Sequence, residues 1–149
     1  MVSEQELKEY CLLLRTENIS IDDFRAWVVK SGIELKGDVT RGDFLKLKNG
    51  SVTQVLKILS KLVTSCDRCA GVYNQKVFSS RSEFENCLSA IEKACSQGVF
   101  NSISKPSWFD TLDKVKFGVE DYYMCDNCHS QWCIVFPEKE FNGEWERIS

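Results

Sequence analysis

The sequence has few residues of several informative kinds: 2 Pro, 2 Met and 1 His among 149 residues, with no excess of positive charge. With so little proline and 43% hydrophobic residues, the composition excludes a disordered chain. No apolar run approaches the roughly 20 residues that span a bilayer. The polar, acidic start does not resemble a secretory signal, so we expect a cytoplasmic protein. The net charge of −3 excludes a generally basic nucleic-acid-binding protein.

The N-terminal part of the sequence predicts helices that begin at side-chain caps. Ser3 and Glu6 fit a capping box, and apolar residues follow at helical spacing, which predicts a helix over residues 4–15. Ser20 begins a second helix, and Gly32 stands where a C′ residue ends it. These segments therefore form a helical portion.

The next segments differ in how clearly they indicate structure. Residues 33–48 suit a short helix or a strand equally well. Ser51 begins a third helix with a strong apolar stripe. After residue 64 the pattern changes, and the run Val72–Phe78 predicts a strand.

The remaining sequence mixes one helix with strands. Ser82 and Glu85 predict the start of a helix that ends at Gly98, and a loop through Pro106 follows. Two strand-like runs come after it, Tyr122–Cys125 and Gln131–Phe136. We expect an α+β fold with a helical portion (residues 1–64) packed on a small antiparallel sheet in a zinc-binding α+β portion (residues 65–149), as one compact unit.

Eight cysteines are many for a chain without an export signal, so metal binding or burial explains them better than disulfides. Four form two CxxC pairs, Cys66/Cys69 and Cys125/Cys128, each reading Cys-Asp-x-Cys with an aromatic residue four positions later. A CxxC turn directs both sulfurs to one side, and two such turns supply the four thiolates of a tetrahedral Zn²⁺ site. We predict one shared structural zinc, resembling the paired knuckles of a zinc ribbon, that holds two neighbouring hairpins together.

The ligand set has alternatives. His129 directly follows Cys128, and Cys133 lies five residues beyond it, so either side chain can replace a sulfur. Strand alternation, however, places Cys133 on the face opposite Trp132. A four-sulfur site also accepts iron. The other cysteines lie on apolar helix faces and are expected in the core: Cys11, Cys87 and Cys95.

Catalysis is not expected from these residues. A zinc ion with four cysteine ligands has no open position for water, and the one histidine lacks a nucleophile constellation around it. A redox CxxC pair belongs at a helix N-terminus, whereas both pairs here are predicted to lead into strands. The run from Cys125 to His129 also fits c-type haem attachment, which normally requires export.

Acidic residues concentrate near the C-terminus. Residues 119–149 carry seven acidic and two basic side chains, a net charge of −5, whereas residues 1–118 carry +2. An acidic surface suits a basic protein partner, and a solvated acidic tail is the simpler alternative. The residues expected to face the partner are Glu138, Glu140, Glu144 and Glu146. Candidate aromatic anchors, of which at least half are expected to be buried, are Tyr122, Tyr123, Phe141 and Trp145.

A second charge pattern leaves another function open. Six basic side chains lie within residues 36–61, and only Phe44 is interleaved as a stacking platform. A solvated helix flank explains this pattern most simply. The alternative function is a nucleic-acid-associated zinc-binding regulatory protein. The basic residues are Lys36, Arg41, Lys46, Lys48, Lys57 and Lys61.

The C-terminal segment resembles that of small bacterial immunity proteins of polymorphic and contact-dependent growth inhibition toxin systems. The shared pattern is a strand with an aromatic residue at Tyr123, the pair Cys125/Cys128, Trp132, Pro137 and the late Gly143-Glu-Trp145. It covers about the last thirty residues. The resemblance implies a non-catalytic cytoplasmic protein that binds one cognate toxin and blocks it. Many such toxins are nucleases with basic clefts, which an acidic face fits.

Overall fold

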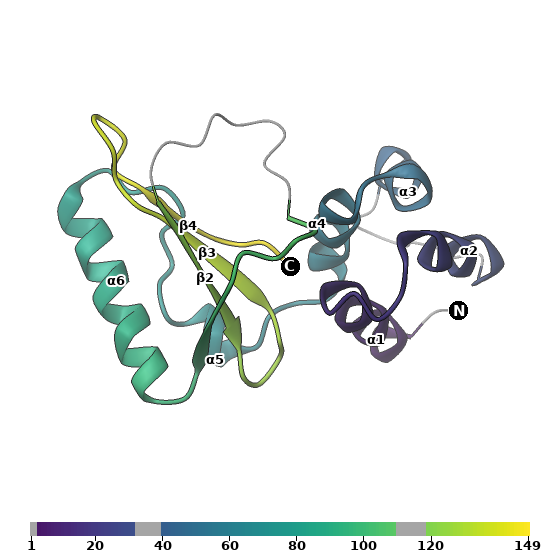
Figure 1. The fold of residues 1–149 in the computed structure, drawn as a ribbon, viewed down its shortest axis with the longest axis horizontal. Coiled ribbons are helices and arrows are strands. Elements are labelled where there is room, and N and C mark those ends of the chain that lie inside the picture. Colours follow the sequence, from purple (N-terminus) through teal and green to yellow (C-terminus); the bar gives the residue numbers. More distant parts are fainter. Residues whose placement is uncertain (1–2, 32–39, 110–118) are drawn as a thin grey trace. The chain divides into compact units, whose positions relative to one another are not determined.

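A computed structural model of the protein describes residues 3–31, 40–109 and 119–149 (Figure 1). The prediction of an α+β fold is confirmed, because the described residues form six helices and a four-stranded antiparallel sheet. The chain divides into two compact units. The first comprises Met1–Thr64 with Ser149, and the second comprises Ser65–Ile148.

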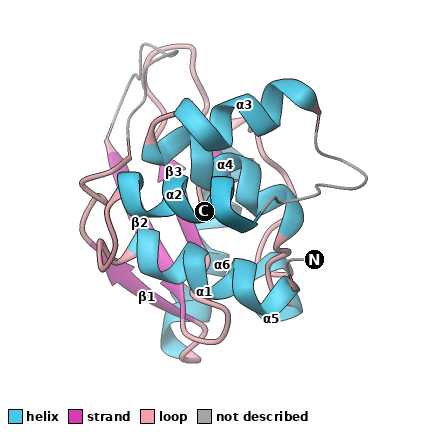
Figure 2. Cartoon of the chain, turned by 90° about the vertical axis from the view of Figure 1, so that its right-hand side faces the viewer, coloured by secondary structure: helices cyan, strands magenta, loops and turns pink. Residues whose placement is uncertain are grey.

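Helices build the described part of the first unit (Figure 2): α1 (Glu4–Arg15), α2 (Ile21–Ser31), α3 (Arg41–Asn49) and α4 (Val52–Leu62). The predicted caps Ser3, Ser20 and Ser51 are confirmed, since each hydroxyl accepts a hydrogen bond from the N–H three residues later. The helices bury their apolar stripes against one another, and Phe24 and Val55 are fully buried. This unit thus has a core of its own.

The segment that fitted two structures is helical where it is described. Thr40 and Asp43 form a capping box, in which the Thr40 hydroxyl accepts from the Asp43 N–H and the Asp43 carboxylate accepts from the Thr40 N–H. That box begins α3 and decides the ambiguity in favour of a helix. Gly32 and the rest of residues 32–39 lie outside the described residues.

The second unit contains two helices and the sheet in its described residues: α5 (Asp67–Ala70), α6 (Arg81–Ser96), β1 (Phe100–Ile103), β2 (Glu120–Cys125), β3 (Gln131–Val135) and β4 (Glu144–Arg147). The strands pair in sequence order, each antiparallel to the next. The register places Tyr123 opposite Trp132, and Ile134 opposite Trp145. One consequence is that the β2–β3 turn and the β3–β4 turn lie at opposite ends of the sheet.

The two faces of the sheet have separate cores. On one face, which α6 covers (Figure 1), Phe100, Trp132 and Trp145 pack with Cys87 and Ile91 of the helix. The indole rings of Trp132 and Trp145 stack with centroids 5.1 Å apart. The other face carries a smaller cluster of Tyr122, Cys133, Val135 and Ile148. The prediction that Cys133 and Trp132 lie on opposite faces of the sheet is confirmed.

Two predictions near the sheet were wrong, one of a strand and one of a loop. Residues 72–78 form no strand: Val77 makes one isolated bridge to Glu144, and its side chain is 62% exposed. The run has strand-like residues but pairs on one side only, with the outer edge of β4. The predicted loop through Pro106 instead contains β1, in which Phe100 is buried in the core. A strand of four residues is too short to show the alternation of apolar and polar residues by which strands are recognised in a sequence.

Two further details differ from expectation. The cap of α6 is Ser80, whose hydroxyl accepts from the Glu83 N–H, and not Ser82, because a second Ser-x-x-Glu pattern starts two residues earlier. Strand β4 was not predicted, because three of its four residues are charged and Trp145 is its only apolar residue.

Among the helices of the described residues, none has the length and apolar character needed to cross a membrane.

Candidate metal centre

The first cysteine pair lies in a single turn of helix. Cys66 is the N-cap of α5 and Cys69 lies within it. The turn is closed by a hydrogen bond of 3.0 Å from the Ala70 N–H to the Cys66 carbonyl. This pair therefore lies in a short helix, and the expectations that it forms part of a hairpin and leads into a strand were wrong.

The second cysteine pair lies at the turn between β2 and β3. Cys125 is the last residue of β2, and the His129 N–H donates to the Cys125 carbonyl over 3.0 Å. This bond is equivalent to the one that closes the first pair, so the sequence repeat extends to the backbone hydrogen bond. His129 has φ of 62°, a left-handed conformation that redirects the chain into β3.

The fold brings the two pairs together at one end of the sheet, where α5 lies beside the β2–β3 turn (Figure 1). The sulfurs of Cys66 and Cys69 are 3.8 Å apart, and two distances between the pairs, Cys66 to Cys125 and Cys69 to Cys128, are 3.6 Å. All four sulfurs lie within 4.8 Å of one another. A tetrahedron with Zn–S bonds of 2.3 Å has edges of about 3.8 Å, so the spacing matches a four-thiolate metal site.

The thiols of this cluster have shifted pKa values. A hydrogen bond from Cys69 lowers the pKa of Cys128 to about 3, while the same bond and burial raise the pKa of Cys69. Burial raises the pKa of Cys125. For Cys66, burial acts upward but hydrogen bonds from the Asn127 side chain and the Cys69 N–H outweigh it, so the pKa is lowered. A lowered pKa favours the thiolate form, which is the form that binds a metal ion.

Two supporting residues were missed by the sequence reasoning. The hydroxyl of Ser130, which is buried, lies 3.2 Å from the Cys128 sulfur, and the Asn127 side chain helps to lower the pKa of Cys66. Such contacts orient metal ligands and stabilise their charge. Their only signal in the sequence is their position inside or just after the second CxxC pair.

The alternative ligands do not join the cluster. Among the described residues, the group of close potential ligands at this site consists of the four cysteines alone. His129 is exposed, and Cys133 is buried in the core of the opposite sheet face. Cys87 is fully buried in the core as expected, and burial raises its pKa to about 12. Cys11 is likewise buried, whereas Cys95 is half-buried beside the core.

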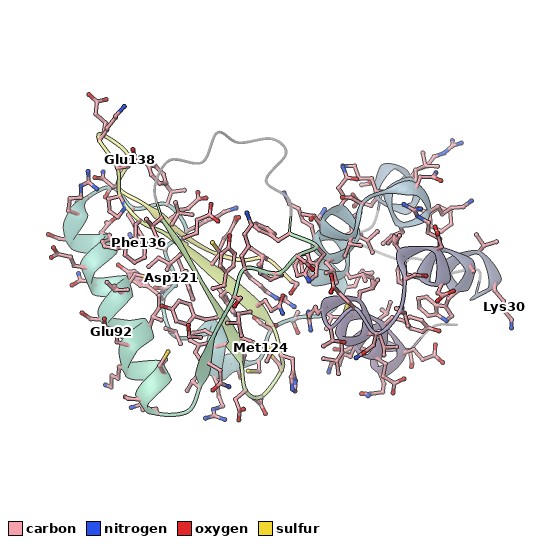
Figure 3. The ribbon with its side chains drawn as sticks, in the orientation of Figure 1. Lys30, Glu92, Asp121, Met124, Phe136 and Glu138 are labelled. Carbon is pink, nitrogen blue, oxygen red and sulfur yellow. The ribbon has the colours of Figure 1, made fainter. Side chains whose placement is uncertain are left out.

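The four glutamates expected to face a partner have different environments. Glu138 and Glu140 are exposed on the β3–β4 turn, and Figure 3 shows Glu138 at the end of the sheet opposite Met124. Glu144 is only 8% exposed. Glu146 forms an ion pair of 3.1 Å with Lys76. Only the first two therefore present free acidic groups on a common turn.

Aromatic and basic candidates are also partly engaged. Three of the four candidate anchors are buried, as expected for at least half of them: Tyr122, Tyr123 and Trp145. The Lys48 ammonium lies over the ring of Phe44, 5.3 Å from the ring centroid. The Lys61 ammonium forms an ion pair of 3.5 Å with the Asp43 carboxylate. Lys36 lies outside the described residues. The ring of Phe44 thus already stacks with a cation of its own helix.

Comparison of the chain with protein-family models, with curated proteins and with solved structures finds no match. The feature with the clearest chemical meaning is the cluster of Cys66, Cys69, Cys125 and Cys128, which can hold a metal ion.

Proposed function

We propose that the four-cysteine cluster binds a structural Zn²⁺ and that the protein acts by binding another protein. The observation that carries the zinc assignment is that all four sulfurs lie within 4.8 Å of one another, with three of their distances at 3.6–3.8 Å. Four thiolates at that spacing suit the tetrahedral preference of Zn²⁺. The metal would join α5 to the β2–β3 turn across the 55 residues that separate the pairs in sequence.

A structural role follows from the ligand count. Four protein sulfurs complete the coordination of Zn²⁺ and leave no position for a reacting water, as catalytic zinc sites require. The backbone bonds that close both turns, from Ala70 and His129, hold the cysteines in place before the metal binds. We therefore infer that the site stabilises the sheet and is not a catalytic centre.

Metal analysis of the protein purified under reducing conditions tests this assignment. We expect one zinc per chain by elemental analysis and by native mass spectrometry. Cys128→Ser should lose most of that zinc. Cys95→Ser is the matched control, because Cys95 is also half-buried but lies outside the cluster, and it should keep the metal. Wild-type protein without metal, or iron in place of zinc, would refute the assignment.

The sharper form of the proposal is an immunity protein that neutralises a cognate bacterial toxin. Its support is the resemblance of the last thirty residues together with their net charge of −5. Several aromatic residues of that resemblance, Tyr123, Trp132 and Trp145, are buried in the core of the sheet. Partner contacts must then come from the surface, and we assign them to the exposed pair Glu138 and Glu140.

Hydrogen bonds hold the backbone of the β3–β4 turn, which carries these two side chains, in a defined conformation. Glu138 and Phe141 exchange backbone hydrogen bonds of 3.0 and 2.9 Å, and the Arg81 guanidinium donates to the Lys139 carbonyl. A turn held in this way loses little conformational freedom on binding. Its negative charge would speed encounter with a basic toxin.

Identification of the partner and its association rate test this function. Native mass spectrometry of the protein from its own host should show a one-to-one complex with a small basic protein. Glu138→Lys with Glu140→Lys should then slow association by about tenfold at low salt. Glu85→Lys with Glu92→Lys, on the exposed side of α6, is the matched control of equal charge change. Equal rates for both double variants would refute the role of the turn.

A further inference from the structure

We propose that the metal centre is a site of reversible oxidation at which a peroxide converts the four thiolates into disulfides between the two cysteine pairs and releases the metal. This inference rests on the proposed zinc site. The more exposed sulfurs are expected to react first, and each has a buried sulfur of the other pair 3.6 Å away as its disulfide partner. The products it names differ from those that the CxxC spacing alone would suggest.

The cluster has two accessible cysteines and two protected ones. Cys66 and Cys128 are half-buried, whereas Cys69 and Cys125 are fully buried. A peroxide arriving from solvent therefore meets the sulfur of Cys66 or Cys128 first. Zinc-bound sulfurs are thiolates, and the thiolate is the form that peroxides oxidise.

Each accessible sulfur has a buried cysteine of the other pair as its close neighbour. Cys66 lies 3.6 Å from Cys125, and Cys128 lies 3.6 Å from Cys69. Within the first pair the two sulfurs are 3.8 Å apart. A disulfide needs about 2.05 Å, so the sulfurs must approach by about 1.5 Å in either case. Each accessible sulfur can therefore form a disulfide with a buried sulfur of the other pair.

The reaction balances with hydrogen peroxide as the oxidant. The Cys66 thiolate attacks one peroxide oxygen, the O–O bond breaks, and a sulfenic acid and hydroxide form. The Cys125 thiolate then attacks the Cys66 sulfur, which forms the disulfide and expels a second hydroxide. Two electrons pass from the two sulfurs to one peroxide. A second peroxide oxidises Cys128 and Cys69 in the same way, and Zn²⁺, without thiolate ligands, leaves.

Disulfides between the pairs would preserve the connection that the metal makes. A Cys66–Cys125 bond still joins α5 to the end of β2, whereas a Cys66–Cys69 bond would leave the two elements unlinked. The oxidised protein is therefore expected to stay folded and to regain zinc after reduction. The half-buried Cys95 offers an internal comparison, since it is accessible to a similar degree but belongs to no group of close potential metal ligands among the described residues.

Peroxide treatment of the zinc-loaded protein, followed by trypsin and mass spectrometry, tests the inference. Cleavage after Arg68 separates Cys66 from Cys69, in peptides 62–68 and 69–76, while Cys125 and Cys128 remain together in peptide 117–139. We expect peptides 62–68 and 69–76 each linked to 117–139, with fragmentation placing the links at Cys125 and Cys128. A colorimetric chelator should report zinc release in parallel, and Cys95 should remain a free thiol.

Three results would overturn the inference: a link between peptides 62–68 and 69–76, oxidation of Cys95 to the same extent as the cluster, or retention of zinc with all thiols free. The zinc content before treatment separates this inference from the proposed function. Zinc present and unaffected by peroxide refutes the oxidation alone. Untreated protein without zinc refutes the proposed site, and the inference fails with it.

Discussion

Removing the metal should cost the second unit a large part of its stability. The metal connects residues 66–69 with residues 125–128 and so closes a loop of about 60 residues. The chain-entropy relation for a cross-link of that span gives about 4 kcal/mol. Small domains have a total free energy of unfolding of about 5–15 kcal/mol. We therefore expect a strong chelator to lower the free energy of unfolding of this unit by about 4 kcal/mol.

Urea denaturation followed by near-UV circular dichroism provides the assay. The stacked indoles of Trp132 and Trp145, with rings inclined by 14°, report on the core of the second unit. Wild-type protein and Cys95→Ser should both respond to the chelator, whereas Cys128→Ser should begin near the chelated value and change little. A wild-type midpoint that is the same with and without chelator would refute the reasoning, because it would show that the metal does not constrain the fold.

Further predictions concern residues outside the cluster. Ile91→Ala should lower the free energy of unfolding by about 2–5 kcal/mol in urea denaturation, because its side chain is fully buried, whereas Ile91→Val should cost about 1 kcal/mol. Gly143→Ala should destabilise more than Gly98→Ala by thermal unfolding: both have positive φ, but a Cβ at Gly143 would lie 2.6 Å from the Val135 carbonyl oxygen, and equal costs would contradict this. Hydrogen bonding in its capping box holds the pKa of Asp43 below its ordinary value, so the carboxylate stabilises the fold above that value and this contribution is lost as pH falls through the lowered pKa. The stability difference between wild type and Asp43→Asn, measured by urea denaturation from pH 7 downward, should shrink in acid.

Elements with a local signal were predicted well. Helix α1 spans Glu4–Arg15 as expected, and the Ser51 cap begins α4. Capping residues and apolar stripes act within a few positions, so they can be recognised without knowledge of the rest of the chain. Where two signals compete over the same short stretch, as Ser80 and Ser82 do, local reasoning chose the wrong one.

Strands were predicted less well because they depend on distant partners. The run Val72–Phe78 resembles a strand in composition but meets only the edge of β4, while the polar β4 becomes a strand by pairing with β3. Strand β1 has four residues and is specified mainly by the burial of Phe100 and by pairing with β2. Backbone hydrogen bonding across the sheet, which the sequence does not display, decided all three.

The candidate site shows the same division. The sequence alone singled out Cys66, Cys69, Cys125 and Cys128, because paired thiolates at CxxC spacing are a local property of the chain. Only the tertiary structure decided that the two pairs meet, with sulfurs 3.6 Å apart, since α5 and the β2–β3 turn are distant in sequence. It also decided that Cys133 and His129 stay outside the cluster and that Glu144 is buried. Residue type sets which chemistry a side chain can perform, but packing sets which side chains are close enough to perform it together.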